Sequence, residues 1–340
     1  MVNWTKGFSS RYYVTIVDKD TWRDGRKLQI TGGSINRSST DLRQSADLQV
    51  AEYSETGERL IRVWLDVSQG SETSHTPLFT GYATSPGRNI NGTRESQSLQ
   101  CYSVLKPADD ILLPRGWYAP ADVNVLWQIK QLLIPTKSPV KIFGNTLEST
   151  NVTLKKSIVA EANETNLTMI DALLKAIKWR MTIGGDGTIY LDAMPEKPVA
   201  MFDSMDRDIL ELSIEDNYDW YSCPNVFRAV MDEDYAEVRD ENPKSPMSIQ
   251  NRGREVWAEE SSCNLKENET LAEYARRRLK ELQTVKRTVK YDRRFRPDIN
   301  VTDIVRLNYP AQKIVGDFVV NSQSISLGFG AKTNEEVKQA

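Results

Sequence analysis

Histidine is almost absent from this chain of 340 residues, in which the only example is His75. It lies in a stretch rich in serine and threonine, which we predict to be an exposed loop. Nucleophilic catalysis through a Ser/His/Asp or Cys/His arrangement would depend on this one residue. The sequence also lacks an HExxH motif, which excludes a zinc peptidase of that type. We therefore predict no catalytic site built on histidine.

Cysteine and long apolar runs are scarce as well. The three cysteines, Cys101, Cys223 and Cys263, are far apart and show no CxxC spacing. We predict buried thiols and neither a disulfide framework nor a zinc site. No apolar run approaches the roughly 18 residues of a spanning helix, and the first residues form no signal core. We expect no membrane anchor and a cytoplasmic site of synthesis.

Neither sign of charge dominates, because the chain has 44 Lys and Arg and 47 Asp and Glu, for a net charge of −3. No positive field draws such a chain onto phosphates, so we predict no specific nucleic-acid binding. Arginines gather at 276–278 and again within 293–296. Acidic residues lie close to both groups, which favours a solvated helix face or an intersubunit salt-bridge surface.

Paired carboxylates are the remaining route to an enzyme, since glycoside hydrolysis needs only two acids. Asp232 and Asp234 form such a cluster, but they lie between two predicted strands and we interpret them as a solvated hairpin tip. The segment Gly184–Gly187 lacks the Lys-Ser/Thr of a P-loop and the repeated acids of an EF-hand. We interpret it as a tight turn that uses glycine for positive φ. We therefore predict no enzyme, and no catalytic, cofactor or metal residues.

Hydrophobic residues make up 39% of the chain and charged residues 27%, which is the ordinary range for globular domains. Up to residue 106 the pattern is of short strands separated by turn clusters, typical of an antiparallel sandwich or barrel. We predict these strands at 12–17, 28–31, 46–53, 60–66, 78–83 and 98–103. The fold class is therefore expected to be mainly β.

Beyond residue 106 the pattern becomes α+β. It predicts helices at 124–133 and 168–178, the second capped by Thr168 with Asp171, and then a hairpin of 179–183 with 188–191. A third helix is predicted at 270–282, where Thr270 and Glu273 form a capping box. Further strands are expected at 225–231, 235–240, 255–259, 285–291, 303–307 and 317–327. Residues 333–340 read as a flexible, frayed tail.

Two sets of segments carry a resemblance to a known family. The first is 303–309 with 316–328 and the preceding helix 271–282, and the second is 35–48 with 77–81 and 98–105. Together they resemble the hub proteins of contractile tail baseplates in phages, defective prophages and phage-tail-like bacteriocins of Gram-positive bacteria, a late-control D-like family. The likeness extends over nearly the whole chain.

The resemblance implies two tube-like β-barrel domains with an α+β domain between them. The first barrel would be 1–106 and the α+β insertion 107–204. The second barrel would combine 205–232 with 285–332, around an insertion at 233–284 that carries the helix 270–282. Three copies would form a ring of six barrels that adapts the sixfold tail tube to the threefold spike. It implies no catalytic residue and no cofactor.

The implied partners are two further copies of the chain, the tail tube protein, the spike protein, and other baseplate and tape-measure proteins. The implied location is the baseplate of a virion or tail-like particle, assembled in the bacterial cytoplasm.

Three other functions remain open at this point. A tail-associated cell-wall hydrolase would use Asp232 with Asp234. A receptor- or glycan-binding tail protein would use exposed tryptophans such as Trp117 to stack on sugar rings. A tube or sheath protein is the third, although the α+β insertion exceeds what a tube subunit needs.

Overall fold

The computed structural model describes residues 2–4, 6–51, 53–84, 86–91, 94–143, 152–204, 209–218, 220–231, 234–261, 263, 265, 269–284, 287–328 and 332–340. The chain forms two compact units. The larger unit holds residues 1–214, 290–338 and 340, and the smaller unit holds 215–289 and 339. The prediction of a mainly β protein is confirmed. Among the described residues, no helix is long and apolar enough to cross a bilayer.

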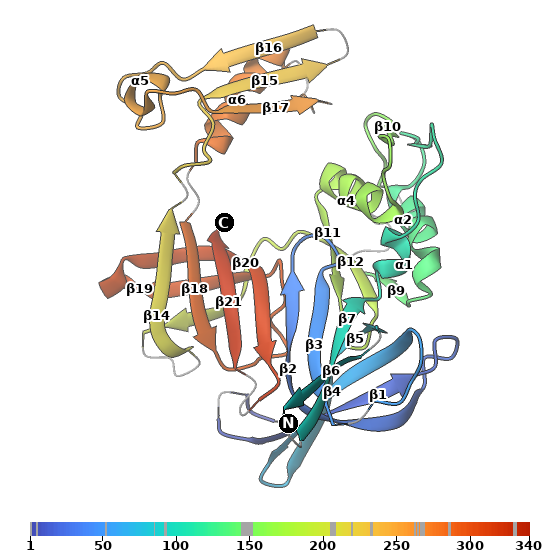
Figure 1. Ribbon diagram of the computed structural model, residues 1–340. Coiled ribbons are helices and arrows are strands. Elements are labelled where there is room, and N and C mark those ends of the chain that lie inside the picture. Colours follow the sequence, from blue (N-terminus) through green and yellow to red (C-terminus); the bar gives the residue numbers. More distant parts are fainter. Residues whose placement is uncertain are drawn as a thin grey trace. The chain divides into compact units, whose positions relative to one another are not determined.

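Six strands of the larger unit pair in a closed ring, which we call the ring sheet (Figure 1). They are β1 (Ser9–Val17), β2 (Asp24–Ser38), β3 (Gln44–Val50), β4 (Arg59–Gln69), β5 (Glu72–Ala83) and β7 (Arg94–Ser103). The order is β1-β4-β5-β7-β3-β2, and β2 pairs back with β1. A short strand, β6 (Gly87–Asn91), pairs with β7. All six strands predicted for this region are confirmed, with most of them longer than expected.

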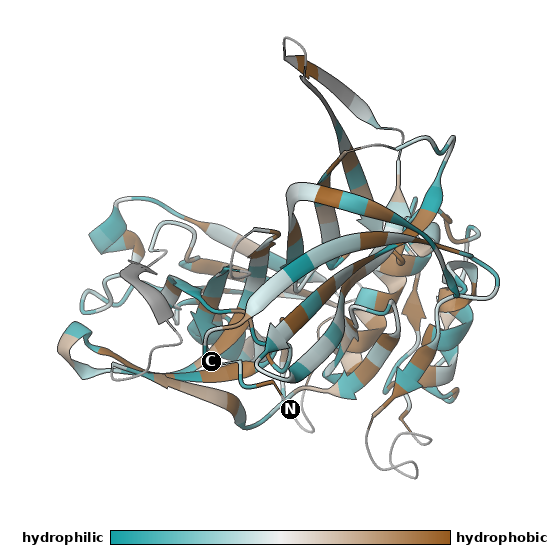
Figure 2. Cartoon of the chain, turned by 90° about the horizontal axis from the view of Figure 1, so that it is seen from below, coloured by the Kyte–Doolittle hydropathy of each residue, from teal (hydrophilic) through white to brown (hydrophobic). Residues whose placement is uncertain are grey.

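Successive side chains of each strand point to alternate faces of the sheet, which explains why the ring closes around an apolar interior. In β4 the side chains of Ile61, Val63, Leu65 and Val67 are fully or almost fully buried and belong to one core cluster. Their neighbours in sequence point to the other face. Figure 2 shows the resulting change between hydrophobic and hydrophilic residues along the strands. Burying each such side chain stabilises the fold by roughly 1.5–3 kcal/mol.

The same sheet continues past the ring into a second group of strands, which we call the C-terminal strands. They are β20 (Ile314–Ser326), β21 (Thr333–Gln339), β18 (Arg287–Arg293), β14 (Ile209–Tyr218), β19 (Ile304–Tyr309) and β13 (Pro198–Asp203). The connection is β2, because Ser34–Ser38 pairs with Ser322–Ser326 of β20. Gly33 has φ +135°, and a Cβ there would lie 2.2 Å from the carbonyl oxygen of Asp47. Only glycine fits where β2 changes partners.

The prediction of a frayed tail at 333–340 is wrong. These residues form β21, and Thr333, Glu335 and Val337 are fully buried. We expected a frayed tail because the stretch is polar. In the structure Glu335 is buried because it forms an ion pair with Arg293 of β18. A paired and hydrogen-bonded charge can be buried where a lone one cannot.

The helical part of the larger unit follows the ring sheet along the chain and precedes β13. It holds α1 (Lys106–Asp109), β8 (Tyr118–Ala119), α2 (Val125–Leu133), the 3₁₀ turn η1 (Ile134–Thr136), β9 (Val140–Ile142), β10 (Ile158–Val159), α4 (Asn166–Ile177), β11 (Trp179–Ile183) and β12 (Ile189–Ala193). The predicted helix at 124–133 and the hairpin are confirmed. Helix α4 begins earlier than predicted, because its cap is Thr165, which forms the capping box with Thr168.

The smaller unit contains β15 (Val226–Met231), β16 (Asp234–Arg239), α5 (Ile249–Arg252), β17 (Trp257–Ser261) and α6 (Leu271–Leu282). Its sheet has the order β16-β15-β17, and α6 packs against β15 and β16. The capping box of Thr270 with Glu273 is confirmed. A further 3₁₀ turn, η2 (Pro310–Gln312), follows β19 in the larger unit.

Two strands pair elsewhere than the sequence led us to expect. We assigned β15 to the second barrel, but it pairs with β16 and β17 of the smaller unit. We assigned β13 to the α+β insertion, but it pairs in parallel with β19. Both assignments followed order along the chain, which carries no information on which distant strand supplies the hydrogen bonds.

Candidate functional site

The turn Gly184–Gly187 is the tight turn that we predicted, with Gly187 at φ +85°. The sequence did not reveal that this turn packs against the ring sheet. Thr80 Oγ1 donates a hydrogen bond to the carbonyl oxygen of Gly185 at 2.7 Å. A Cβ on Gly185 would come within 1.9 Å of the carbonyl oxygen of Pro77 on β5. Glycine is therefore needed here for close backbone approach.

Arg62 of β4 in the ring sheet stabilises the contact between the turn Gly184–Gly187 and β5. Its side chain is 8% exposed and its Nη1 lies 2.6 Å from Asp24 Oδ2. Its Nε donates to Thr80 Oγ1 at 3.0 Å, and its Nη2 donates to the carbonyl oxygen of Asp186 at 3.2 Å. One buried guanidinium thus joins β2, β5 and the turn through its fixed fork of donors.

The strand β11 is held on its other side by the residues that lead into β19. Arg180 Nη1 donates to Asp303 Oδ1 at 2.7 Å and to Thr302 Oγ1 at 3.1 Å. From the ring sheet, Gln44 Nε2 donates to the carbonyl oxygen of Ile183 at 2.6 Å. The hairpin β11–β12 is therefore hydrogen-bonded both to the ring sheet and to the segment just before β19.

A charged network lies buried among the C-terminal strands, and we call it the buried network. Arg293 and Glu335 are 1% and 0% exposed and form an ion pair at 2.8 Å. Tyr291 Oη donates to Glu335 at 2.6 Å, and Gln323 Nε2 donates to it at 2.7 Å. Burial opposes ionisation, but the charge of Arg293 and these donors outweigh it and keep the pKa of Glu335 below its usual value. Arg293 is therefore not the surface arginine that we predicted.

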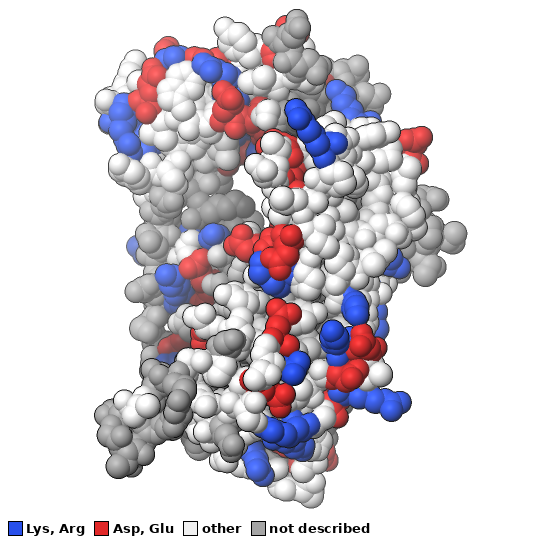
Figure 3. Space-filling model, turned by 45° about the vertical axis from the view of Figure 1, so that its right-hand side comes forward, with Lys and Arg blue, Asp and Glu red and all other residues white. Residues whose placement is uncertain are grey.

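The arginines of α6 do match the interpretation as a salt-bridged helix face. Arg277 pairs with Glu269 at 2.7 Å and with Glu281 at 3.1 Å. Arg278 pairs with Glu260 at 2.9 Å and with Glu281 at 2.7 Å. Figure 3 likewise shows acidic and basic side chains interspersed over the described part of the face it draws. No phosphate-binding surface follows from these arginines.

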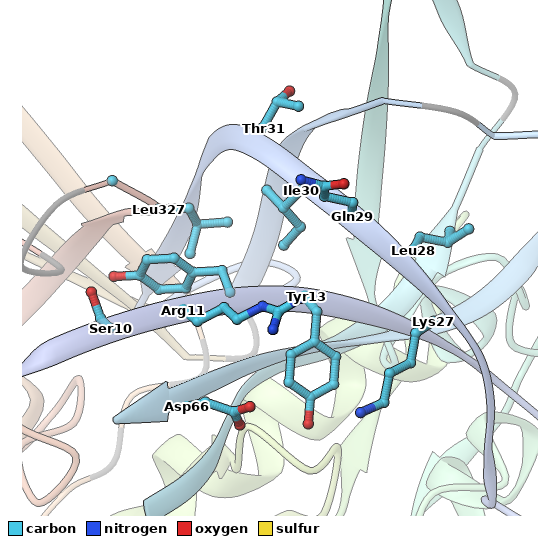
Figure 4. Close-up of a pocket in the computed structure, with 12 residues that line it drawn as sticks. Ser10, Arg11, Tyr13, Lys27, Leu28, Gln29, Ile30, Thr31, Asp66 and Leu327 are labelled. Atoms are coloured by element: carbon cyan, nitrogen blue, oxygen red, sulfur yellow. The ribbon is translucent and has the colours of Figure 1, made fainter. Parts of the chain in front are cut away.

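A groove of about 560 Å³ opens where β1 and β2 separate (Figure 4). The pairing of the two strands begins at Tyr13 with Gln29, and among the described strands the preceding part of β1 pairs only with β4. Tyr13 lies between Asp66 and Lys27, whose Nζ is 4.3 Å from the ring centroid. Burial and then the charge of Asp66 raise the pKa of Tyr13. With both charge signs and several hydroxyls, the groove is suited to binding a polar group.

The residues singled out by the sequence are not brought together. His75 is on β5 rather than in a loop, with Nδ1 2.7 Å from Asp66 Oδ1. Trp117 is half-buried and packs against the core of the helical part, so only part of its ring is available for the stacking that the glycan-binding alternative requires. Asp232 lies outside the described residues, and Asp234 begins β16. The described residues contain no group of three or more potential metal ligands from His, Cys, Asp and Glu.

The three cysteines are buried, as predicted. Burial raises the pKa of the Cys101 thiol far above its ordinary value, and it raises that of Cys263 as well. A thiol with a raised pKa is a poor nucleophile, because the thiolate is the reactive form. These side chains therefore act as small apolar residues of the core.

No protein-family model and no curated protein sequence matches the chain. Solved structures do match. A tail protein from Neisseria meningitidis MC58 aligns with a TM-score of 0.67 at 15% identity, over 97% of this chain and 96% of that one. The 43 kDa tail protein of prophage MuSo2 from Shewanella oneidensis gives 0.66 at 13% identity, over 98% of both chains. Prophage tail protein gp18 from Listeria monocytogenes EGD-e gives 0.54 at 14% identity, over 97% and 94%.

These likenesses extend from end to end, so they concern the whole arrangement of strands and helices. At such identities they establish the fold, which is that of solved tail proteins. The predicted resemblance to tail proteins is thereby confirmed at the level of the fold.

Proposed function

We propose that the chain is a structural, non-enzymatic hub of a contractile tail baseplate. The observation that carries the proposal is the match to tail proteins over nearly the full length of both chains. The hub would adapt a sixfold tail tube to a threefold spike, with the tube, the spike and other baseplate and tape-measure proteins as partners. Its location would be a virion or tail-like particle, assembled in the bacterial cytoplasm.

In this proposal the ring sheet is the first tube-like barrel and the C-terminal strands form most of the second. The ladder between β2 and β20 supports it, because continuous backbone pairing keeps two neighbouring wall segments rigid. The hairpin β11–β12 supports it as well, since its buried hydrogen bonds reach Thr80 on one side and Asp303 on the other. A tube wall under mechanical load requires such rigidity.

The proposed assembly is a homotrimer, which would place six barrels in one closed ring with heterologous contacts. An apolar edge of the C-terminal strands supports self-association. Val199 and Met201 of β13 and Val315 of β20 are 46%, 53% and 59% exposed. Among the described strands, β13 pairs only with β19 and so presents a free edge. Exposed apolar side chains beside a free strand edge are typical of subunit contacts.

The mass of the protein in solution tests the proposal, measured by light scattering across concentration, with and without the spike protein. We expect a threefold complex, alone or on addition of spike. Met201→Glu should abolish it, because the change places a charge at the apolar edge. Val159→Glu is the matched control, since Val159 is 65% exposed on β10, away from that edge. A strict monomer that ignores the spike contradicts the hub.

A further inference from the structure

A small cavity lies where the ring sheet, β11 and the segment 300–302 meet. Its volume is about 20 Å³, and the polar side chains around it include those of Arg37, Arg43, Gln44, Asn300 and Thr302. A cavity of roughly 10–15 Å³ holds one water molecule, so this one admits a single group of that size.

Arg37 is the unusual member of this lining. It is 8% exposed and stands on β2 between Gln44 of β3 and Gln323 of β20 in the strand register. Its Nη2 donates to the carbonyl oxygen of Leu78 at 2.8 Å, and its Nε finds no acceptor among the described residues. A guanidinium carries five N–H donors, and the Nε donor of this buried group lacks an acceptor among the described residues.

The charge of Arg37 is likewise uncompensated within the described part of the chain. Burial, and then the nearby positive charge of Arg293, lower the pKa of Arg37 to about 10, and no carboxylate opposes this shift. The group therefore stays protonated at neutral pH. Arg293 is committed to Glu335, and Arg43 is committed to Asp171. A buried cation without a counter-charge is strongly unfavourable.

We propose that this cavity binds a small monovalent anion of the halide class, with chloride as the expected ligand, and that Arg37 is its main partner. The anion would supply the missing negative charge and accept hydrogen bonds from the surrounding donors. It would also stabilise the junction of β2, β11 and the segment 300–302, on which the relative position of the two strand groups depends. This site does not depend on the proposed hub function.

A bound water is the competing occupant. Gln44 Oε1 has no donor among the described residues, and a water could donate to it. Water would nevertheless leave the positive charge in place, which is why the anion is favoured. The two occupants differ in electron density and in their dependence on salt type, so they can be told apart.

The first test is thermal unfolding of the full chain in sodium chloride and in sodium gluconate at equal ionic strength, which equalises screening. Gluconate is a much larger anion than chloride. We expect the melting temperature to rise by about 2–4 °C with chloride relative to gluconate and then to saturate. Arg37→Met should remove this difference, whereas Arg306→Met, at an exposed ion pair, should retain it. Equal melting temperatures in both salts for the unaltered protein would overturn the proposal.

The second test uses the unaltered protein and stays decisive if Arg37→Met does not fold. Crystals grown or soaked in sodium bromide are measured at the bromine absorption edge. An anomalous peak in the cavity beside Arg37 supports the proposal. A peak-free cavity, or one that holds only a water, contradicts it.

Discussion

The ring sheet and the C-terminal strands belong to one continuous sheet but are stabilised in different ways. The ring encloses an apolar cluster in which Ile61, Leu65 and Phe79 are completely buried. The C-terminal strands bury a charged network around Arg293 and Glu335. Apolar packing is non-directional and tolerates adjustment, whereas a buried network requires every partner in place. The strand β21 is therefore positioned by a specific charge and not by a run of apolar residues.

This difference also bears on strand register. A slip of one residue would turn Glu335 to the opposite face of the sheet and leave Arg293 buried without its partner. The buried network therefore specifies one register for β21, although β21 has few apolar side chains to do so.

The largest expected effect comes from removing one member of the buried network. Glu335→Ala should lower the free energy of unfolding by about 3–5 kcal/mol, because Arg293 is left as a buried, unpaired charge. Chemical denaturation followed by circular dichroism measures the change. The double variant Arg293→Met/Glu335→Leu should recover most of the loss, since neither charge of the pair is then buried. A double variant as unstable as the single one would show that the pair itself, and not the orphaned charge, matters.

In the ring sheet the corresponding variant is Leu65→Ala, at a fully buried position of β4. We expect a loss of about 2–5 kcal/mol, set by the cavity that remains. Leu65→Met, which roughly conserves volume, should cost less than about 1.5 kcal/mol. If Leu65→Ala changed stability no more than Leu65→Met, the ring core would not be packed as described.

A smaller effect is expected where the turn of 184–187 meets the ring. Gly185→Ala should lower stability by about 1–3 kcal/mol, because the added methyl collides with the backbone of Pro77. Gly7→Ala is the control, since nothing lies within 4 Å of a Cβ there, and it should change stability by no more than about 0.5 kcal/mol. Thermal unfolding of both variants side by side makes the comparison, and equal melting temperatures would refute the close contact.

The smallest effect is expected at an exposed ion pair of the C-terminal strands. Arg306 and Asp317 form a bidentate pair at 2.6 and 2.8 Å, with side chains 50% and 35% exposed. Asp317→Asn should cost no more than about 1 kcal/mol, because solvent already screens the charges. Denaturant titration at low and high salt measures it. A loss approaching that of Glu335→Ala would remove the distinction between buried and exposed charge.

The local elements were predictable because their signals are local. The capping box of Thr270 with Glu273 indicated the start of α6, and the strand predicted at 60–66 indicated β4. Each depends on residues within one turn or one strand. Their lengths were less accurate, because strand ends are decided by pairing partners.

The long-range contacts had no comparable signal. Ser324 hydrogen-bonds Asn36 across 288 residues, and Glu335 pairs with an arginine 42 residues earlier. A polar segment has the same composition whether it frays or pairs with a buried partner. The strand β21 was therefore missed. The close contact of Gly185 with β5 was missed because a turn glycine and a contact glycine look alike in sequence.

The number of copies of this chain in an assembled tail particle tests the hub most directly. Particles purified from producing cells would carry the chain with a fluorescent label, and the label would be counted and located along the tail. The account predicts three copies, all at the baseplate end. Many copies along the tail, as for a tube or sheath protein, or none at all, would contradict it.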